Sequence, residues 1–166
     1  MRLLHKIGLF ALIGLCGCAS YNVQKTETGA KNLNRSEFVY LALASGGNAE
    51  QNKQVQAAFE KALSDQGVSV YAGRTLLSQA AVFALAKKMD NGYVLYSEIV
   101  KWEDHNTPWS TIRDKVSISV KVIEAGSGKI LARDVLEGKS TFCTMKNTAP
   151  EAILPELVSQ YVETLY

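Results

Sequence analysis

The feature that most restricts the fold is the alternation of short apolar runs with segments of helical periodicity. Residues 38–44 form a continuous apolar run, which is typical of a strand buried on both faces of a sheet. Apolar residues then recur at helical spacing over 55–63, and residues 68–72 predict a second short strand. A second helix is expected over 75–90, with Thr75 as its cap, and a third strand over 93–102. Strands joined by helices in this way lie parallel and are connected by right-handed crossovers.

The second half of the chain predicts an antiparallel hairpin and a final helix. Residues 115–122 alternate between apolar and polar, and a glycine-rich turn at 126–128 leads into a fifth strand over 129–140. A bulge is expected near Arg133 and Asp134, where the alternation fails. Residues 153–165 have helical spacing. The prediction is a single α/β domain of order βαβαβββα, with a mixed sheet, parallel first strands, an antiparallel hairpin pair and helices packed on it.

The amino terminus has the layout of a secretory signal peptide. A basic start is followed by an apolar run over 7–15, which is too short to span a membrane. The run ends in Leu15, Cys16, Gly17 and Cys18, which resembles the lipobox of bacterial lipoproteins. This resemblance implies that Cys18 receives diacylglycerol on its sulfur and becomes the first residue, commonly with a third acyl chain on its amino group. The alternative is an ordinary signal peptide that ends near a cysteine.

Three segments are therefore expected. Residues 1–17 are the signal peptide, residues 18–36 are the lipidated cysteine with a polar tether, and residues 37–166 are the α/β domain. A flexible tether of that length reaches roughly 20–25 Å. Because no aspartate follows the cysteine, the expected location is the periplasmic face of the outer membrane.

Charge and cysteine content exclude some functions. The chain has 18 lysines and arginines against 16 acidic residues, and loss of Arg2 and Lys6 with the signal balances the two. With no basic patch, nucleic acid is not expected as a partner. Only Cys143 remains as a free thiol, so no intramolecular disulfide forms. It is either a small buried residue or a site for an intermolecular bridge.

Two separated stretches resemble a family of bacterial lipoproteins named domain of unknown function 4823. They are the segment 102–110 with its two tryptophans, followed by Asp114, and the segment 137–140, which reads Glu-Gly-Lys-Ser. Pro150, ahead of a terminal helix, completes the pattern. The likeness covers roughly residues 37 to 166 and implies an envelope location and an α/β fold, but no activity. The order of elements also resembles the amino-terminal domain of TolB and lipoprotein activators of penicillin-binding proteins, at the level of fold alone.

The loops that follow the parallel strands predict one candidate binding edge. Ligands of open α/β sheets usually bind at the carboxyl ends of the strands. The fifth strand runs in the same direction, so its end is expected at the same edge. The residues expected there are Arg74, Trp102, Glu103, Asp104, His105, Trp109, Arg113 and Lys139.

The alternative for this edge is structural. Trp102 and Trp109 can clamp a long hairpin, with Asp104 and Asp114 capping its turns. Catalysis has little support, because His105 is the only histidine of the mature chain and no serine lies in a nucleophile elbow. Its acidic neighbours are consecutive and cannot converge on a metal, so no cofactor is expected.

Three functions remain as hypotheses. The first is a non-catalytic accessory module that is held at the membrane by lipid on Cys18 and binds an envelope protein through the tryptophan loop. The second is a binder of a small ligand or cell-wall glycan, with the indoles as stacking platforms. The third is an envelope hydrolase that uses His105.

Overall fold

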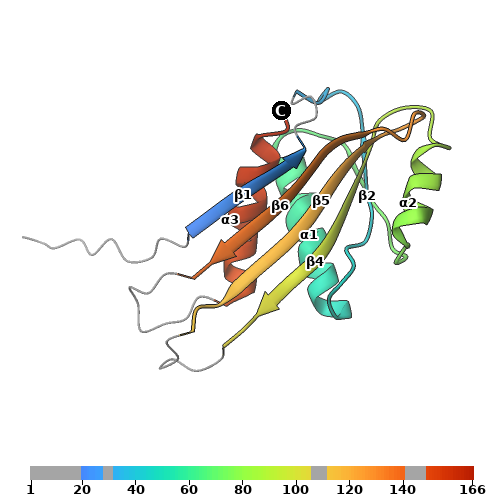
Figure 1. Cartoon of the computed structure of the whole chain (residues 1–166). Helices are drawn as coiled ribbons and strands as arrows, with labels where there is room; N and C mark the ends of the chain where they lie inside the picture. The colour runs from blue at the N-terminus through green and yellow to red at the C-terminus, as the bar shows by residue number, and fades with distance from the viewer. Residues whose placement is uncertain (1–19, 28–31, 106–111, 141–148) are drawn as a thin grey trace, which may run out of the picture.

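A six-stranded mixed sheet lies at the centre of the molecule (Figure 1). The computed structural model describes residues 20–27, 32–105, 112–140 and 149–166. The elements are β1 (Ser20–Glu27), β2 (Val39–Leu41), α1 (Ala49–Asp65), β3 (Val70–Ala72), α2 (Gln79–Ala86), β4 (Tyr93–Glu103), β5 (Lys115–Glu124), β6 (Ile130–Lys139) and α3 (Pro150–Glu163). The strands lie in the order β1-β6-β5-β4-β2-β3.

The predicted order βαβαβββα is confirmed from β2 onward. Strand β2, next to the edge strand β3, pairs in parallel with β3 on one side and with β4 on the other. Strands β4, β5 and β6 then form antiparallel pairs. The bulge expected at Arg133 and Asp134 is not found there, because both residues pair in regular register with Lys121 and Val120 of β5. The irregularity in β6 lies instead at Leu131, which is skipped between Ala132 and Ile130. Opposite Arg133 and Asp134, the extra residue belongs to β1, between Lys25 and Glu27.

The polar tether expected over residues 18–36 is wrong over residues 20–27. Residues 20–27 form β1, which pairs antiparallel with β6 from Ser20 opposite Lys139 to Glu27 opposite Arg133. Farther along, the backbone N–H of Leu33 donates to the carbonyl of Leu165 over 2.8 Å. Apolar periodicity gave no signal for β1, because a strand at the edge of a sheet is stabilised mainly by backbone hydrogen bonds to its neighbour.

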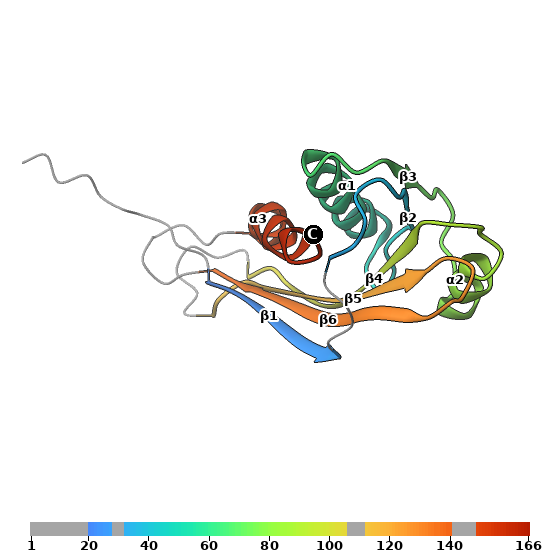
Figure 2. The same cartoon turned by 90° about the horizontal axis from the view of Figure 1, so that it is seen from above.

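Helices cover the two faces of the sheet unequally. Helices α1 and α3 lie together on one face, and α2 lies near one end of the sheet (Figure 2). Neighbouring residues of β4 point to opposite faces. Accordingly, Leu95 belongs to the large core under α1 and α3, whereas Val94 and Tyr96 pack with Val82 and Ala86 of α2. The large core continues to the loops that follow β4, and the small one is confined to the α2 end.

A buried polar pair closes the large core. The rings of Phe59 and Tyr161 meet edge to face with centroids 6.4 Å apart. The Tyr161 hydroxyl donates to a carboxylate oxygen of Asp134 over 3.0 Å, and both residues are buried. Burial, followed by the neighbouring carboxylate, raises the pKa of Tyr161 well above its ordinary value. The helix that carries Tyr161 is therefore fixed to β6 by a specific polar contact as well as by packing.

Helix α2 begins later and is more exposed than the sequence suggested. Its cap is Ser78, whose hydroxyl accepts the N–H of Ala81, and not Thr75. Within it, only Val82 and Ala86 are buried. An apolar stripe of Leu77, Ala81, Ala84 and Leu85, which helical spacing would turn toward the core, borders an open pocket instead. The reason is that α2 covers only the end of its face of the sheet.

Candidate functional site

The predicted binding edge is divided between two distant places. Strands β2 and β3 end level with Leu95 of β4, whereas β4 continues to Glu103. Those eight residues of extended chain span about 26 Å at roughly 3.3 Å per residue. Arg74, which follows β3, is therefore far from the residues that follow β4. The second place is named the loop end here and consists of residues 100–105, 112–115 and 139–140.

The loop end brings together six of the eight predicted residues. They are Trp102, Glu103, Asp104 and His105 from β4 and its exit, Arg113 ahead of β5, and Lys139 at the end of β6. Trp109 lies outside the described residues. Strand pairing causes the clustering, because Glu103 and Lys139 both lie opposite Lys115 of the intervening strand.

Asp114 holds the loop end together. It is fully buried, and one carboxylate oxygen accepts the backbone N–H of His105 over 2.6 Å. Its own N–H donates to the hydroxyl of Ser140 over 3.1 Å, and the N–H of Ser140 donates to its carbonyl over 3.0 Å. The exit of β4, the start of β5 and the end of β6 are thus joined through one residue. The expectation that Asp114 stabilises the turns is confirmed for His105.

Gly138 allows α3 to approach the sheet at the loop end. A Cβ at this position would lie 2.5 Å from Cγ2 of Ile153 and 3.1 Å from Cγ1 of Val116. Any side chain would therefore displace the helix. Gly138 and Ser140 thus have structural roles, which sequence reasoning did not assign to them.

The charged residues of the loop end form a solvated cluster. Glu103 accepts from Lys101 over 3.0 Å and lies 3.9 Å from Lys115. The hydrogen bond from Lys101 is the largest cause that lowers the pKa of Glu103. Such exposed pairs contribute little to stability. Among the described residues, no group of three or more His, Cys, Asp or Glu is placed to hold a metal ion.

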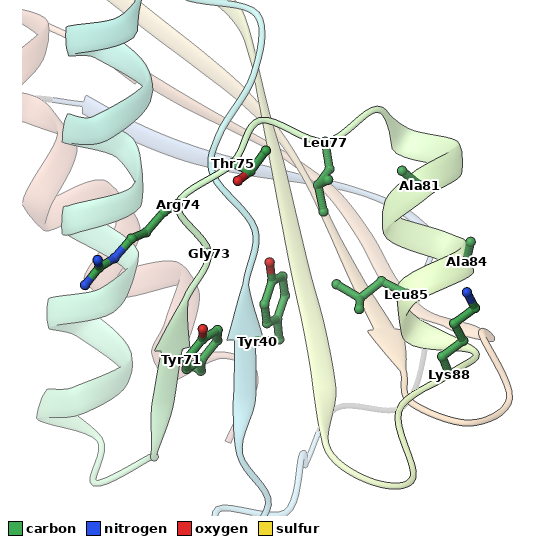
Figure 3. Close-up of a pocket in the computed structure, with 10 residues that line it drawn as sticks. All are labelled: Tyr40, Tyr71, Gly73, Arg74, Thr75, Leu77, Ala81, Ala84, Leu85 and Lys88. Carbon is green, nitrogen blue, oxygen red and sulfur yellow. The ribbon is translucent and has the colours of Figure 1, made fainter.

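Arg74 lies at the other of the two places, which is named the tyrosine pocket here. This open cavity of about 570 Å³ lies between the ends of β2 and β3 and helix α2 (Figure 3). The rings of Tyr40 and Tyr71 stack with centroids 5.6 Å apart and an angle of 28°. Its lining residues are Tyr40, Tyr71, Gly73, Arg74, Thr75, Leu77, Ala81, Ala84, Leu85 and Lys88.

Local contacts keep the pocket open. A Cβ at Gly73 would collide with the hydroxyl of Tyr40, so glycine is needed beside that ring. The side-chain amide of Gln56 on α1 donates to the carbonyls of Gly73 and Leu41, over 2.7 and 3.3 Å. These bonds fix the ends of both strands, and therefore the two tyrosines, against α1.

The pocket combines apolar surface with unpaired positive charge. Leu77 and Leu85 come from the α2 side, and Arg74 and Lys88 lie at opposite rims (Figure 3). Within the described part of the chain, neither of these cations forms an ion pair. Burial, followed by the charge of Tyr71, raises the pKa of Tyr40, which therefore stays a neutral hydrogen-bonding phenol at physiological pH. Such a cavity is suited to a ligand group that is partly apolar and negatively charged.

Sequence reasoning missed the tyrosines and Lys88. A signal was available, because Tyr40 and Tyr71 are the polar aromatics in two strands that were both expected to be parallel. Their register, which places Tyr40 opposite Tyr71, was not available from the sequence.

The fold is shared with several bacterial proteins of low sequence identity. PelC from Paraburkholderia phytofirmans, solved as a dodecamer, has a TM-score of 0.66 at 14% identity, over 88% of this chain and 97% of that one. A Xanthomonas campestris protein of the DUF330 family gives 0.54 at 12%, over 89% and 92%. Lipoprotein GNA1162 from Neisseria meningitidis gives 0.50 at 17%, over 76% and 96%. At these identities the likeness defines the class of fold and nothing more.

Within that class the family is defined by sequence. The model of the domain of unknown function DUF4823 matches residues 31–165, so the chain belongs to this family. The resemblance inferred from the two tryptophans and the Gly-Lys-Ser segment is confirmed. No curated protein sequence matches the chain.

Proposed function

We propose that this protein is a lipoprotein of the bacterial outer membrane that acts as a non-catalytic binding module for another envelope protein. Lipid on Cys18 attaches it to the periplasmic face, as the residues before that cysteine indicate. Several acyl chains provide lasting attachment, whereas one chain binds only reversibly. No helix in the described residues is long and apolar enough to cross a membrane.

The observation that carries the binding role is the composition of the tyrosine pocket. Tyr71 keeps 65% of its surface exposed although it lies in a strand, and Leu76, in the segment between β3 and α2, keeps 56%. Tyrosine and arginine are the residues that most often dominate protein interfaces. A partner that inserts an apolar side chain between the tyrosines and α2, with a carboxylate near Arg74 or Lys88, would use every feature of the cavity.

A cell-wall glycan is the second candidate. Exposed aromatic rings are stacking platforms for sugars, and the ring of Tyr71 offers one face to solvent. Calorimetry with soluble wall fragments separates the two, because heat that disappears in Tyr71→Ala would favour the glycan. A hydrolase that uses His105 is the remaining candidate, and an unchanged cellular phenotype in His105→Ala would exclude it.

Two experiments test the proposal. Palmitate labelling and fractionation test the anchor: we expect label and outer-membrane location for the native chain, and loss of both in Cys18→Ser. A photoreactive residue placed at Tyr71 tests the pocket in intact cells, with exposed Glu60 on α1 as the matched position. We expect a defined protein adduct from position 71 that is lost in Arg74→Glu. Equal adducts from both positions, or none from 71, would contradict the binding role.

A further inference from the structure

We infer that the loop end lies directly against the lipid headgroups of the membrane. The inference rests on the proposed lipid at Cys18. Strand β1 begins at Ser20, which lies opposite Lys139 at the end of β6. Two residues of extended chain span at most about 7 Å. The lipidated cysteine must therefore lie beside the loop end, and not at the distance that a free tether would give.

Strand pairing makes this position fixed. The register of β1 continues along β6 from Ser20 to Glu27, so the chain cannot swing away from the sheet near its anchor. The following segment is also held, because the N–H groups of Asn32 and Leu33 donate to the carbonyl of Leu165 over 3.1 and 2.8 Å. The chain is thereby held to the domain from Ser20 onward.

The surface chemistry of the loop end suits a membrane interface. Val100 and Ile112 keep 63% and 55% of their surfaces exposed, although both are large apolar residues. The same end of the sheet carries three lysines, at positions 101, 115 and 139. Lys139 lies next to the start of β1, and therefore next to the anchor. Apolar side chains among lysines are attracted to a bilayer that contains anionic lipids.

Acidic residues at the same end do not cancel this attraction. Glu103 is engaged by Lys101 and Lys115, and its negative charge is retained because those contacts lower its pKa. Asp104 is exposed, and Asp114 is buried within the turns. The exposed Asp104 therefore offsets part of the positive charge of Arg113 and Lys139, which are also exposed. The electrostatic part of the contact is small, and the apolar pair contributes most of the attraction.

The orientation has a consequence for the tyrosine pocket. The pocket lies about 26 Å farther along the strands, at roughly 3.3 Å per residue. With the loop end on the bilayer, the pocket opens into the periplasm, where a partner can reach it. The four large apolar side chains that are most exposed in the described residues thus divide into a membrane pair, Val100 and Ile112, and a second pair away from the membrane. The second pair is Tyr71, which lines the pocket, and Leu76, in the segment between β3 and α2.

A matched pair of probes tests the inference. In a Cys143→Ser chain, cysteine replaces either Ile112 or Leu76, whose exposed fractions are 55% and 56%. The lipidated proteins carry an environment-sensitive dye on that cysteine and are placed in vesicles of phosphatidylethanolamine and phosphatidylglycerol, with a trace of lipid that bears a headgroup nitroxide. We expect strong nitroxide quenching at position 112 and little at 76, with the reverse order for aqueous iodide.

The same sample separates the two proposals. Mass spectrometry of the amino-terminal peptide reports the lipid on Cys18, and flotation reports attachment. Lipidated, floating protein with equal quenching at both positions would overturn the orientation alone. Absence of the lipid would overturn both proposals. A second readout uses Trp102, which lies in β4 at the loop end. In a Trp109→Phe chain it is the single tryptophan, and brominated lipids should quench its fluorescence in the lipidated protein.

Discussion

The loop end and the tyrosine pocket lie far apart on the same sheet, one at the ends of β4, β5 and β6 and the other beside β2 and β3, and they are built in opposite ways. At the loop end, the polar groups are used internally: Asp114 binds His105 and Ser140, and Glu103 is engaged by two lysines. At the pocket, Arg74 and Lys88 form no ion pair within the described chain, and a cavity separates them. A fixed end positions the domain, whereas an open end with unused charge is available to a partner.

The largest expected effect comes from Gly138→Val, which forces α3 away from the sheet. We expect the free energy of unfolding to fall by about 3 kcal/mol, the upper range for an overpacked core. Urea unfolding measures this. Gly73→Val is the matched change at the pocket, where the new Cβ collides mainly with the hydroxyl end of the Tyr40 side chain and not with a helix. It should cost less and alter the pocket instead. An equal loss in both variants would remove the distinction between the two ends.

Asp114→Ala should have the next largest effect. It leaves the buried N–H of His105 without its carboxylate acceptor, at a cost of about 2 kcal/mol. The bonds to Ser140 come from the backbone of residue 114 and are kept. Amide hydrogen exchange should become faster at His105. The corresponding change at the pocket is Gln56→Ala, which removes two hydrogen bonds to strand carbonyls and should loosen β3 first. An unchanged exchange rate at His105 would show that Asp114 does not hold the loop end.

Two tyrosines of the large core should make the stability of the protein fall in alkali. Tyr166 has a pKa raised from 10.0 to about 12, mainly by burial, and Tyr161 is raised well above the same value. The native state keeps these protons while the unfolded chain loses them. Stability is therefore full below pH 10 and falls as the pH rises toward 12 and beyond. Tyr161→Phe should flatten this fall and cost about 1 kcal/mol at neutral pH, because Asp134 loses a donor. An unchanged alkaline slope would contradict the role of Tyr161.

The smallest effect on stability is expected for Tyr71→Ser at the pocket. The side chain is mostly exposed, so the free energy of unfolding should change by no more than about 0.5 kcal/mol. Partner cross-linking from a probe at Leu76 should nevertheless be lost. A variant that keeps its adducts would exclude the stacked ring from recognition, and a variant that unfolds would make Tyr71 a structural residue.

Much of the fold could be predicted because its strands bury one or both faces. The alternation in residues 115–122 and the helical stripe at 55–63 both reflect contact with the large core, and both elements form as expected. Strand β1 could not be predicted, since its stability comes from backbone pairing with β6, which leaves no apolar period.

The candidate site could be predicted only in part, for a geometric reason. Sequence order places Arg74 and Trp102 after parallel strands, but it does not give the lengths of those strands. Strand β3 has three residues and β4 has eleven, so the two carboxyl ends are far apart. The tyrosine pocket depends on the register between Tyr40 and Tyr71 and on the late start of α2, neither of which apolar periodicity reveals.

The pairing of β1 with β6 is the central claim, because it fixes the anchor beside the loop end. Cysteines at Asn22 and Glu137 test it directly, since these residues lie opposite one another. In a Cys143→Ser chain we expect mild oxidation to form this disulfide. The pair Asn22 and Val135, two residues out of register, should keep both thiols free. Absence of the first disulfide, or preference for the second, would contradict the account.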